Sequence, residues 1–317
     1  MLRFLIRRLA LAAVTLLLLT MIVFALSNVL PANVGRAILG PFAPQASVDE
    51  LNHRLGTDRP LYIQYLKRME GYAQLDFGNS YQSREPVTKL IAKSVGNSAK
   101  LAILALLVTV PLGIFGGTFA ALRQGSLLDR GIVGISLAGA SLPEFVTSTF
   151  LVVVFGVNFG IFPVLARIPD GADPLTQLYY LAMPIMALVI VYFGYIARMA
   201  RAGVISALES DYTRTAIMKG LPRSVVIRRH VLRNALLPTI AVIATQTGYL
   251  FGGLLAVELI FNYNGLGRLL VSAARDKDLP ILSAGVLVIG VIYMLATLAA
   301  DILISILNPR VRLGEDS

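Results

Sequence analysis

The stretch "DYTRTAIMKGLPRSVVIRRH", residues 211–230, is strongly cationic, yet it lies between two of the most apolar runs in the chain. Asp211 favours a helix N-terminus, through capping and through its charge against the helix dipole. Gly220 suits the left-handed position that ends a helix, and Pro222 suits the first turn of the next one. The pattern therefore predicts two short helices joined by a rigid turn, residues 212–219 and 222–233.

The surrounding composition is that of a membrane protein. Of the 317 residues, 56% are hydrophobic and 15% are charged, and the mean hydropathy is +0.74. The formal net charge is +10, but the basic residues flank apolar segments, as the positive-inside rule and anionic lipid headgroups both favour. No basic surface with interleaved aromatic residues is present, so we expect no nucleic-acid partner.

Cysteine and histidine usage excludes several kinds of site. The chain has no cysteine and only two histidines, His53 and His230. Disulfides, thiolate metal sites and cysteine nucleophiles are therefore impossible, and a histidine-rich metal site is excluded too. We predict no catalytic residue, no metal ligand and no cofactor bound by this chain.

Six uncharged or nearly uncharged segments approach or exceed the length of about 20 residues that a bilayer-spanning helix needs. Because backbone polar groups must be satisfied inside lipid, we expect helices there. The segments are residues 9–26, 101–122, 131–157, 175–197, 234–257 and 279–307. The sequence thus predicts an all-α polytopic membrane protein with six transmembrane helices, in which internal residues such as Gly113 mark kinks or close helix contacts.

Positive charge predicts the orientation. Arg3, Arg7 and Arg8 precede the first apolar segment and place the N-terminus in the cytoplasm. We expect that segment to be a retained helix and not a cleaved signal. Six spans then place three further stretches on the cytoplasmic side, residues 123–130, 198–233 and 310–317, so that both termini are cytoplasmic.

Four regions are expected along the chain: a basic segment with the first transmembrane helix (1–30), an extracytoplasmic helical segment (31–96), the core transmembrane domain (97–310), whose coupling loop is 199–234, and a cytoplasmic tail (311–317). In the second region, Ser47 and Glu50 match a capping box. Pro60 suits the first turn of a following helix, whose apolar residues fall on one face. These residues are Tyr62, Ile63, Leu66 and Met69.

From the residues alone, the basic loop has two interpretations. It is either a rigid element that contacts a partner or an ordinary positive-inside loop whose arginines bind lipid phosphates.

A resemblance to a known family bears on this choice. The stretch "DYTRTAIMKGLPRSVVIRRHVLRNALLP" resembles the cytoplasmic loop in permease subunits of ABC importers for peptides, nickel and related solutes. "LGTDRPLYIQYL", "LDFGNSY", "GSLLDR", "VELIFNYNGLGRLL", "DKDLP" and "NPRVR" resemble other parts of the family in the same order. The chain departs from the family pattern at Glu144, Asn264 and Asn308, outside the loop.

The resemblance implies the fold of a type I ABC importer transmembrane domain in the bacterial cytoplasmic (inner) membrane. It implies that residues 211–222 form a coupling helix that docks on a cytoplasmic ATPase subunit. The matching residues are Asp211, Tyr212, Arg214, Thr215, Ala216, Lys219, Gly220 and Leu221. No G-x-x-x-x-G-K-[ST] phosphate loop is present, so ATP and Mg²⁺ belong to partner subunits. The implied partners are a second homologous permease, two ATPase subunits, an extracytoplasmic solute-binding protein and membrane lipid.

Two carboxylates are candidates for the translocation path. Glu144 lies in the third apolar segment, where an ionised side chain is costly. It is either a path residue that meets a cationic substrate group, a structural partner of a polar group on a neighbouring helix, or a residue close enough to the outer interface to stay hydrated. Glu258 lies at the end of the fifth segment, where the following loop either contacts a substrate-binding protein, gates the path or is a plain interfacial loop. For Asp301, in the sixth segment, we favour an interfacial helix contact.

Two other classes of function have weaker support in the sequence. A self-contained secondary transporter needs intramembrane carboxylates or broken helices at matched positions, usually with an inverted repeat, and no repeat is evident. A lipid-modifying enzyme needs convergent acid–base or metal-binding residues, which two histidines expected on opposite sides of the membrane do not supply. The sequence does not choose among dipeptides, longer peptides, glutathione-like or opine-like compounds and nickel chelates as the solute.

Overall fold

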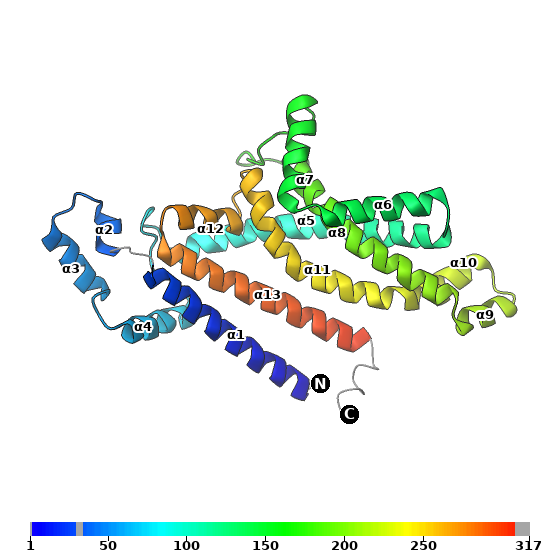
Figure 1. Ribbon diagram of the computed structural model, residues 1–317, viewed down its shortest axis with the longest axis horizontal. Coiled ribbons are helices and arrows are strands. Elements are labelled where there is room, and N and C mark those ends of the chain that lie inside the picture. Colours follow the sequence, from blue (N-terminus) through cyan, green and yellow to red (C-terminus); the bar gives the residue numbers. More distant parts are fainter. Residues whose placement is uncertain (1, 30–33, 308–317) are drawn as a thin grey trace. The chain divides into compact units, whose positions relative to one another are not determined.

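The computed structural model describes residues 2–29 and 34–307, and their regular secondary structure is helical (Figure 1). A single isolated antiparallel bridge joins Asn79 and Pro86 in that part of the chain. The chain forms two compact units, Met1–Ser98 with Asn264–Ile292, and Ala99–Tyr263 with Tyr293–Ser317. Two helices, α5 (Val87–Leu122) and α13 (Leu279–Leu307), contribute residues to both units.

Five helical segments are long and apolar enough to cross a bilayer: Arg8–Leu26 within α1 (Leu2–Val29), Val87–Leu122, Pro174–Leu208, Arg223–Ile260 and Leu279–Leu303. The all-α membrane fold predicted from the sequence is therefore confirmed. The predicted helix over 279–307 has the bounds of α13, whereas α5 and α8 (Pro174–Leu208) extend beyond the predicted spans.

The predicted third span, residues 131–157, is broken. α6 (Leu127–Ser141) and the segment formed by α7 (Glu144–Leu151) and η1 (Val152–Asn158) meet at 107°, so the pair is either one broken span or a re-entrant loop. Pro143 explains the break, because proline lacks an N–H and excludes the α conformation from the residue before it. Leu142 is accordingly extended, with φ −91° and ψ 128°.

In the second unit, α8 is the central helix. Asp173 caps its N-terminus by accepting hydrogen bonds from the amides of Leu175 (3.1 Å) and Thr176 (3.3 Å). A further hydrogen bond, from the Thr176 hydroxyl, is the main reason that the pKa of Asp173 lies below its ordinary value. The buried side chains of α8 form one core with α5, α7 and α11 (Leu232–Ile260), to which α8 contributes Leu181, Met183, Leu188 and Val191.

Glycines allow the helices of this unit to approach closely. A Cβ atom at Gly194 of α8 would lie 2.1 Å from the carbonyl oxygen of Ser136 in α6, and one at Gly139 of α6 would lie 2.3 Å from that of Ile190 in α8. Gly113 of α5 packs against Ile196, as its place in an apolar segment predicted. Because these glycines carry no side chain, the backbones of α6 and α8 can lie in direct contact.

In the first unit, a core joins the start of α5, α12 (Leu266–Arg275) and the start of α13. Ser98 accepts a hydrogen bond from the Leu266 amide (2.8 Å) and so supplies a cap for α12. Asp278, which directly precedes α13, accepts a hydrogen bond from the Ser80 hydroxyl (2.5 Å). Val87, Ile91, Leu266, Ala273, Ile281 and Ala284 are the buried core residues.

Local predictions for this unit were partly wrong. α3 (Gln45–Leu55) begins before Ser47, with Pro44 as its N-cap and no side-chain cap, so the capping box is absent. Pro60 precedes α4 (Leu61–Ala73) as its N-cap. Within the predicted apolar face, Tyr62 and Leu66 are exposed. Tyr65 and Arg68 of α4 contact α1 instead, and α2 (Val34–Leu39) packs on α3.

Candidate functional site

The predicted coupling residues lie on α9 (Asp211–Met218) and the turn after it, in the second unit. Two α9 side chains face inward: Thr213 is 1% exposed and Ala216 is 4% exposed. Ala216 belongs to a small apolar core with Val204 and Ala207 of α8, Val226 and Val231 of the following segment, Ala121 of α5 and Ala235 of α11. Four stretches of chain therefore hold α9 in place.

Hydrogen bonds fix the start of α9 to the end of α8. The Thr213 hydroxyl donates to the carbonyl oxygen of Ala207 (2.6 Å), and the Ser210 hydroxyl donates to the same oxygen (2.6 Å). Ser210, and not Asp211, is the N-cap residue, although Asp211 opens the first turn as predicted. The Ala207 carbonyl oxygen, near the end of α8, is thereby satisfied by side chains at the start of α9.

The end of α9 is a Schellman turn. The Gly220 amide donates to the Ile217 carbonyl oxygen (2.9 Å), and the Leu221 amide donates to that of Ala216 (3.4 Å). Gly220 has φ +73°, which confirms the predicted left-handed conformation. A glycine is favoured here because other L-residues rarely adopt this conformation. Only four residues, 219–222, separate the end of α9 from the next helical segment.

The outer face of α9 combines charged and apolar side chains. Tyr212 is 41% exposed, Ile217 is 61% exposed and Met218 is 79% exposed. The remaining exposed members of the set are Asp211, Arg214, Thr215, Lys219, Gly220 and Leu221. Asp211 Oδ1 and Arg214 Nη1 are 3.9 Å apart, and both side chains are exposed, so the attraction between the two charges is weak. An exposed apolar group on a rigid helix is typical of a protein-contact surface.

The second short helix differs from its predicted form. α10 (Arg223–Val225) and η2 (Val226–Val231), which is a π-helix, run directly into α11, so residues 223–260 form one continuous helical segment. Its arginines are exposed, at positions 223, 228, 229 and 233. The π-helical stretch was not predicted, and no residue in it is a reliable sequence signal for such geometry. A displacement of the loop would thus pass directly into α11.

A buried ion pair next to this segment was also missed. The Arg201 guanidinium of α8 donates two hydrogen bonds to Asp129 of α6, Nε to Oδ1 (2.6 Å) and Nη2 to Oδ2 (2.8 Å). The Gly125 amide donates to the same Oδ2 (2.9 Å). Asp129 is buried, and Ser126 caps α6 beside it. The pair fixes the α5–α6 turn to the end of α8, and no sequence signal pointed to it, because its members are 72 positions apart.

Glu144 is the first residue of α7, at the break in the third apolar segment. Its Oε1 accepts a hydrogen bond from the Tyr192 hydroxyl of α8 (3.3 Å). A Cβ atom at Gly253 of α11 would lie 2.7 Å from the same oxygen. The carboxylate therefore faces the interior of the second unit, between α8 and α11.

Glu258 lies five residues after Gly253 on α11, about 7.5 Å further along the helix axis. Its side chain is completely buried. Burial, and next the Glu258 carboxylate, raise the pKa of Tyr263 to about 12. Glu144 thus lies against α11, whereas Glu258 lies on α11 at a different height.

Fold and site together define a helical membrane subunit with a rigid, partly apolar loop element and no phosphate-binding loop of its own. In the part of the chain that the structure describes, no group of three His, Asp or Glu side chains is placed to hold a metal ion. The class that these features define is a transport subunit.

The chain belongs to the family of binding-protein-dependent transport system inner membrane components. The model of that family matches residues 113–313, and the model of its N-terminal region matches residues 1–102. Together the two matches include the predicted coupling segment, residues 211–222, and both Glu144 and Glu258.

Curated relatives match nearly the whole chain. A putative peptide transport system permease protein of Brucella abortus is 34% identical over 306 residues, which cover 96% of this chain and 98% of the relative. The di/tripeptide transport system permease protein DppB of Pseudomonas aeruginosa is 34% identical and covers 98% of this chain and 99% of its own length. The glutathione transport system permease protein GsiC of Shigella flexneri is also 34% identical, with the same coverage.

Solved structures support the fold. An amino acid ABC transporter chain aligns with a TM-score of 0.50 at 19% identity, covering 70% of this chain and 94% of its own. A chain of the MetNI methionine ABC transporter aligns with a TM-score of 0.54 at 15% identity, covering 71% and 99%. The transmembrane fold of an ABC importer is therefore confirmed.

Proposed function

We propose that this chain is the subunit through which an ATP-driven importer moves small peptides across the bacterial inner membrane, and that residues 211–222 couple it to an ATPase subunit. Supporting this, α9 is held rigidly by Thr213 and Ala216 while Tyr212, Ile217 and Met218 remain exposed. A rigid element joined to α8 on one side and α11 on the other can convert a partner's movement into movement of both helices.

The proposed partners follow from what this chain lacks. It has no phosphate loop, so two cytoplasmic ATPase subunits supply ATP hydrolysis with its Mg²⁺. A second, homologous permease completes the path, and an extracytoplasmic binding protein delivers the solute. The solute is a small peptide, because the relatives are named for peptides, di/tripeptides and glutathione.

A pull-down tests the coupling segment. The tagged full chain is isolated from its native membrane in mild detergent, and copurifying proteins are identified by mass spectrometry. Ile217→Glu places a charge on the exposed apolar face without disturbing the buried one, and Gln124→Glu, in the exposed α5–α6 turn, is the matched control. We expect ATPase subunits with the unchanged chain and the control, and their loss with Ile217→Glu, while the second permease remains.

Three results would contradict the proposal. Equal recovery of the ATPases with Ile217→Glu would remove residues 211–222 from the docking surface. Recovery of the chain alone, under conditions that keep other membrane complexes intact, would argue against an importer subunit and favour a loop that binds lipid. Uptake that survives ATP depletion but collapses with an uncoupler would instead indicate a secondary transporter.

Glu144 and Glu258 remain candidates for the translocation path. Glu144 also has a structural role available, because it accepts a hydrogen bond from Tyr192. Glu144→Gln keeps the side-chain volume and an acceptor oxygen but removes the charge. Uptake is compared for cationic and neutral dipeptides. Selective loss of cationic uptake supports a path residue, and unchanged uptake of both discards that role.

A further inference from the structure

A cavity of about 680 Å³ lies within the first unit, between α2, α3, α4, the segment after α4 and the start of α13. Its lining is strongly cationic: one carboxylate, Asp76, faces four basic residues, Arg59, Lys67, Arg68 and Arg84. The carboxylate is already engaged, because it accepts a hydrogen bond from the Gly78 amide (2.9 Å). The cavity therefore attracts anions.

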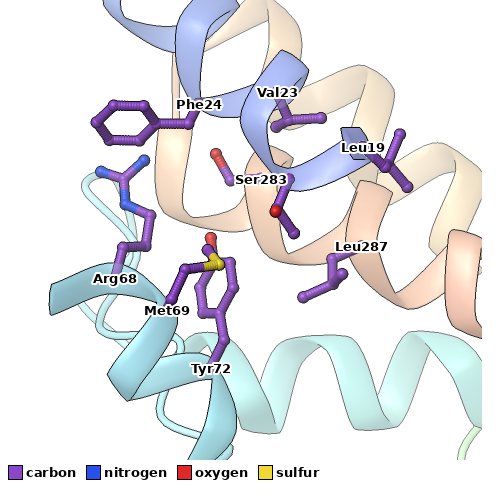
Figure 2. Close-up of a pocket in the computed structure, with 9 residues that line it drawn as sticks. Leu19, Val23, Phe24, Arg68, Met69, Tyr72, Ser283 and Leu287 are labelled. Carbon is purple, nitrogen blue, oxygen red and sulfur yellow. The ribbon is translucent and has the colours of Figure 1, made fainter. Parts of the chain in front are cut away.

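Arg68 has the most unusual environment of the four. Its Nη1 atom is buried and has no hydrogen-bond partner in the protein. Figure 2 shows a smaller pocket that Arg68 also lines, in which its side chain rises from α4 toward the Phe24 ring, whose centroid is 5.3 Å from the guanidinium carbon. A buried guanidinium nitrogen without an acceptor is costly, and an oxyanion would satisfy it.

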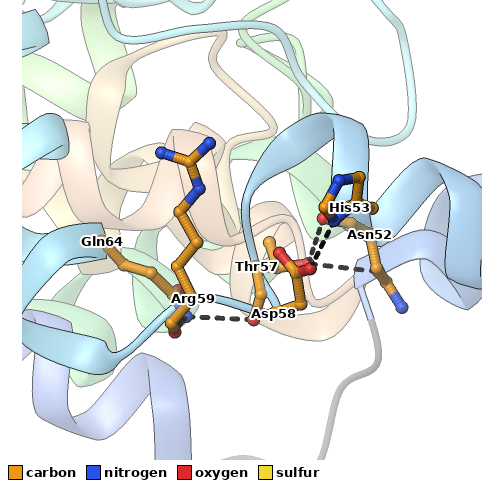
Figure 3. Close-up of polar contacts among 6 residues, drawn as sticks. All are labelled: Asn52, His53, Thr57, Asp58, Arg59 and Gln64. Atoms are coloured by element: carbon orange, nitrogen blue, oxygen red, sulfur yellow. Dashed lines mark hydrogen bonds and ion pairs between the residues drawn. The ribbon is translucent and has the colours of Figure 1, made fainter.

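Neighbouring carboxylates are occupied elsewhere. Asp278 accepts a hydrogen bond from the Ser80 hydroxyl (2.5 Å). Asp58, directly before Arg59, contacts His53 Nδ1 (2.7 Å), and this hydrogen bond lowers the pKa of Asp58. In Figure 3 the Arg59 guanidinium points away from the His53–Asp58 contact. Among the described residues, none of the four cations that line the cavity takes part in an ion pair.

The depth of Arg68 in the bilayer follows from the part of α1 that α4 contacts. α4 packs on α1 through a Tyr65–Thr20 hydrogen bond (2.9 Å) and an edge-to-face contact between Tyr65 and Phe24. The apolar part of α1 ends at Leu26. Phe24 is two residues from that end, about 3 Å along the helix axis. The guanidinium beside it therefore lies near the boundary between the hydrocarbon and the lipid headgroups.

We propose that this cavity binds the phosphate of an anionic phospholipid from the adjacent leaflet. Arg68 donates to the phosphate from the buried side, and Arg59, Lys67 and Arg84 surround it. Arginine suits this task because its planar group donates two parallel hydrogen bonds to phosphate oxygens. The apolar lining residues accommodate the start of an acyl chain, and they include Ile38, Leu39, Ile63 and Phe77. The proposal does not depend on the coupling role of α9.

Native mass spectrometry of the full chain in nonionic detergent tests the proposal. Phosphatidylglycerol, phosphatidylcholine and water-soluble glycerol phosphate are titrated separately. We expect one tightly bound phosphatidylglycerol, with phosphatidylcholine and glycerol phosphate at least tenfold weaker. Arg68→Gln should weaken phosphatidylglycerol binding about tenfold, which is the effect of losing one charged hydrogen bond.

Two further variants keep the test decisive if Arg68→Gln does not fold. Arg84→Gln and Lys67→Gln alter exposed side chains and should each weaken phosphatidylglycerol binding severalfold. Arg54→Gln is the control, because Arg54 is exposed on α3, pairs with Glu50 and does not line the cavity. Equal binding of the two lipids, or unchanged binding in the cavity variants, would overturn the proposal. Binding of glycerol phosphate as tight as that of the lipid would assign the cavity to a soluble anion instead.

Discussion

Arg201 and Asp129 join segments that are 72 positions apart in the chain. Each carboxylate oxygen accepts from the guanidinium, and one also accepts from the Gly125 amide, so the buried charge of Asp129 is well satisfied. The pair lies beside the core that supports α9, because Ala121 and Val204 belong to that core. Its energetic role is therefore to hold the support of the loop element in one arrangement.

Removing one member of the pair should destabilise the protein. We expect Arg201→Ala to lower the free energy of unfolding by about 2 kcal/mol, because Asp129 is left buried and unpaired while the partly exposed arginine limits the loss. Arg201→Lys should lower the free energy of unfolding by less than Arg201→Ala does, because lysine keeps the positive charge but cannot donate two parallel hydrogen bonds to the carboxylate. Thermal unfolding in detergent measures both changes.

Arg130→Ala is the control, because Arg130 is exposed and forms no ion pair recorded in the described residues; it should change stability by less than about 0.5 kcal/mol. If Arg201→Ala unfolded at the temperature of this control, the ion pair would have no structural role.

Gly220 allows a test of backbone strain alone. A Cβ atom there would meet nothing within 4 Å, so a substitution introduces no clash, but φ is +73°. We expect Gly220→Ala to cost about 1 kcal/mol of unfolding free energy, and Gly220→Asn to cost less, because asparagine tolerates the left-handed region. Gly131→Ala is the matched control: it has the same open surroundings in a helix. Equal stability of Gly220→Ala and Gly131→Ala would show that the turn relaxes.

At the scale of elements, the glycine contacts between α6 and α8 decide how closely those helices pack. Gly194→Ala would place a Cβ atom 2.1 Å from the Ser136 carbonyl oxygen, so α6 must move. We expect a loss of about 2 kcal/mol in unfolding free energy, as for overpacking elsewhere. Gly134→Ala, on α6 but with nothing within 4 Å, should stabilise by about 0.5–1 kcal/mol instead. The opposite order of melting temperatures would refute this account of the contact.

The elements that the sequence predicted well are those whose signal is local and long. Apolar segments of about 20 residues identified the spans, and the Gly220–Pro222 pair identified the turn after α9. The misses arise where distant contacts compete with local signals. Ser47 matched a capping box, but α3 begins earlier, at Gln45. The Asp129–Arg201 pair has no local signal because its members are far apart in sequence.

For the whole molecule, the number of crossings sets the side of each terminus. Six crossings place both termini on one side of the membrane, whereas a re-entrant α6–α7 pair leaves five and places them on opposite sides. We expect six, with both termini cytoplasmic, because six crossings place the basic loop, residues 198–233, on the same side as the arginines near the N-terminus, whereas five would place it outside. Reporter fusions at the two ends, one active only in the cytoplasm and one only outside, measure this. Opposite results at the two ends would establish the re-entrant loop.

The break at Pro143 has a consequence for biosynthesis. α6 has 15 residues, which span about 22 Å, so it is shorter than the hydrocarbon layer of about 30 Å. Emerging from the ribosome, α6 and α7 cannot settle in lipid one at a time as independent helices. They become stable only when α8 follows and its Gly194 receives α6. Newly made chains should therefore keep this segment inside the insertion machinery until residues beyond α8 have been synthesised.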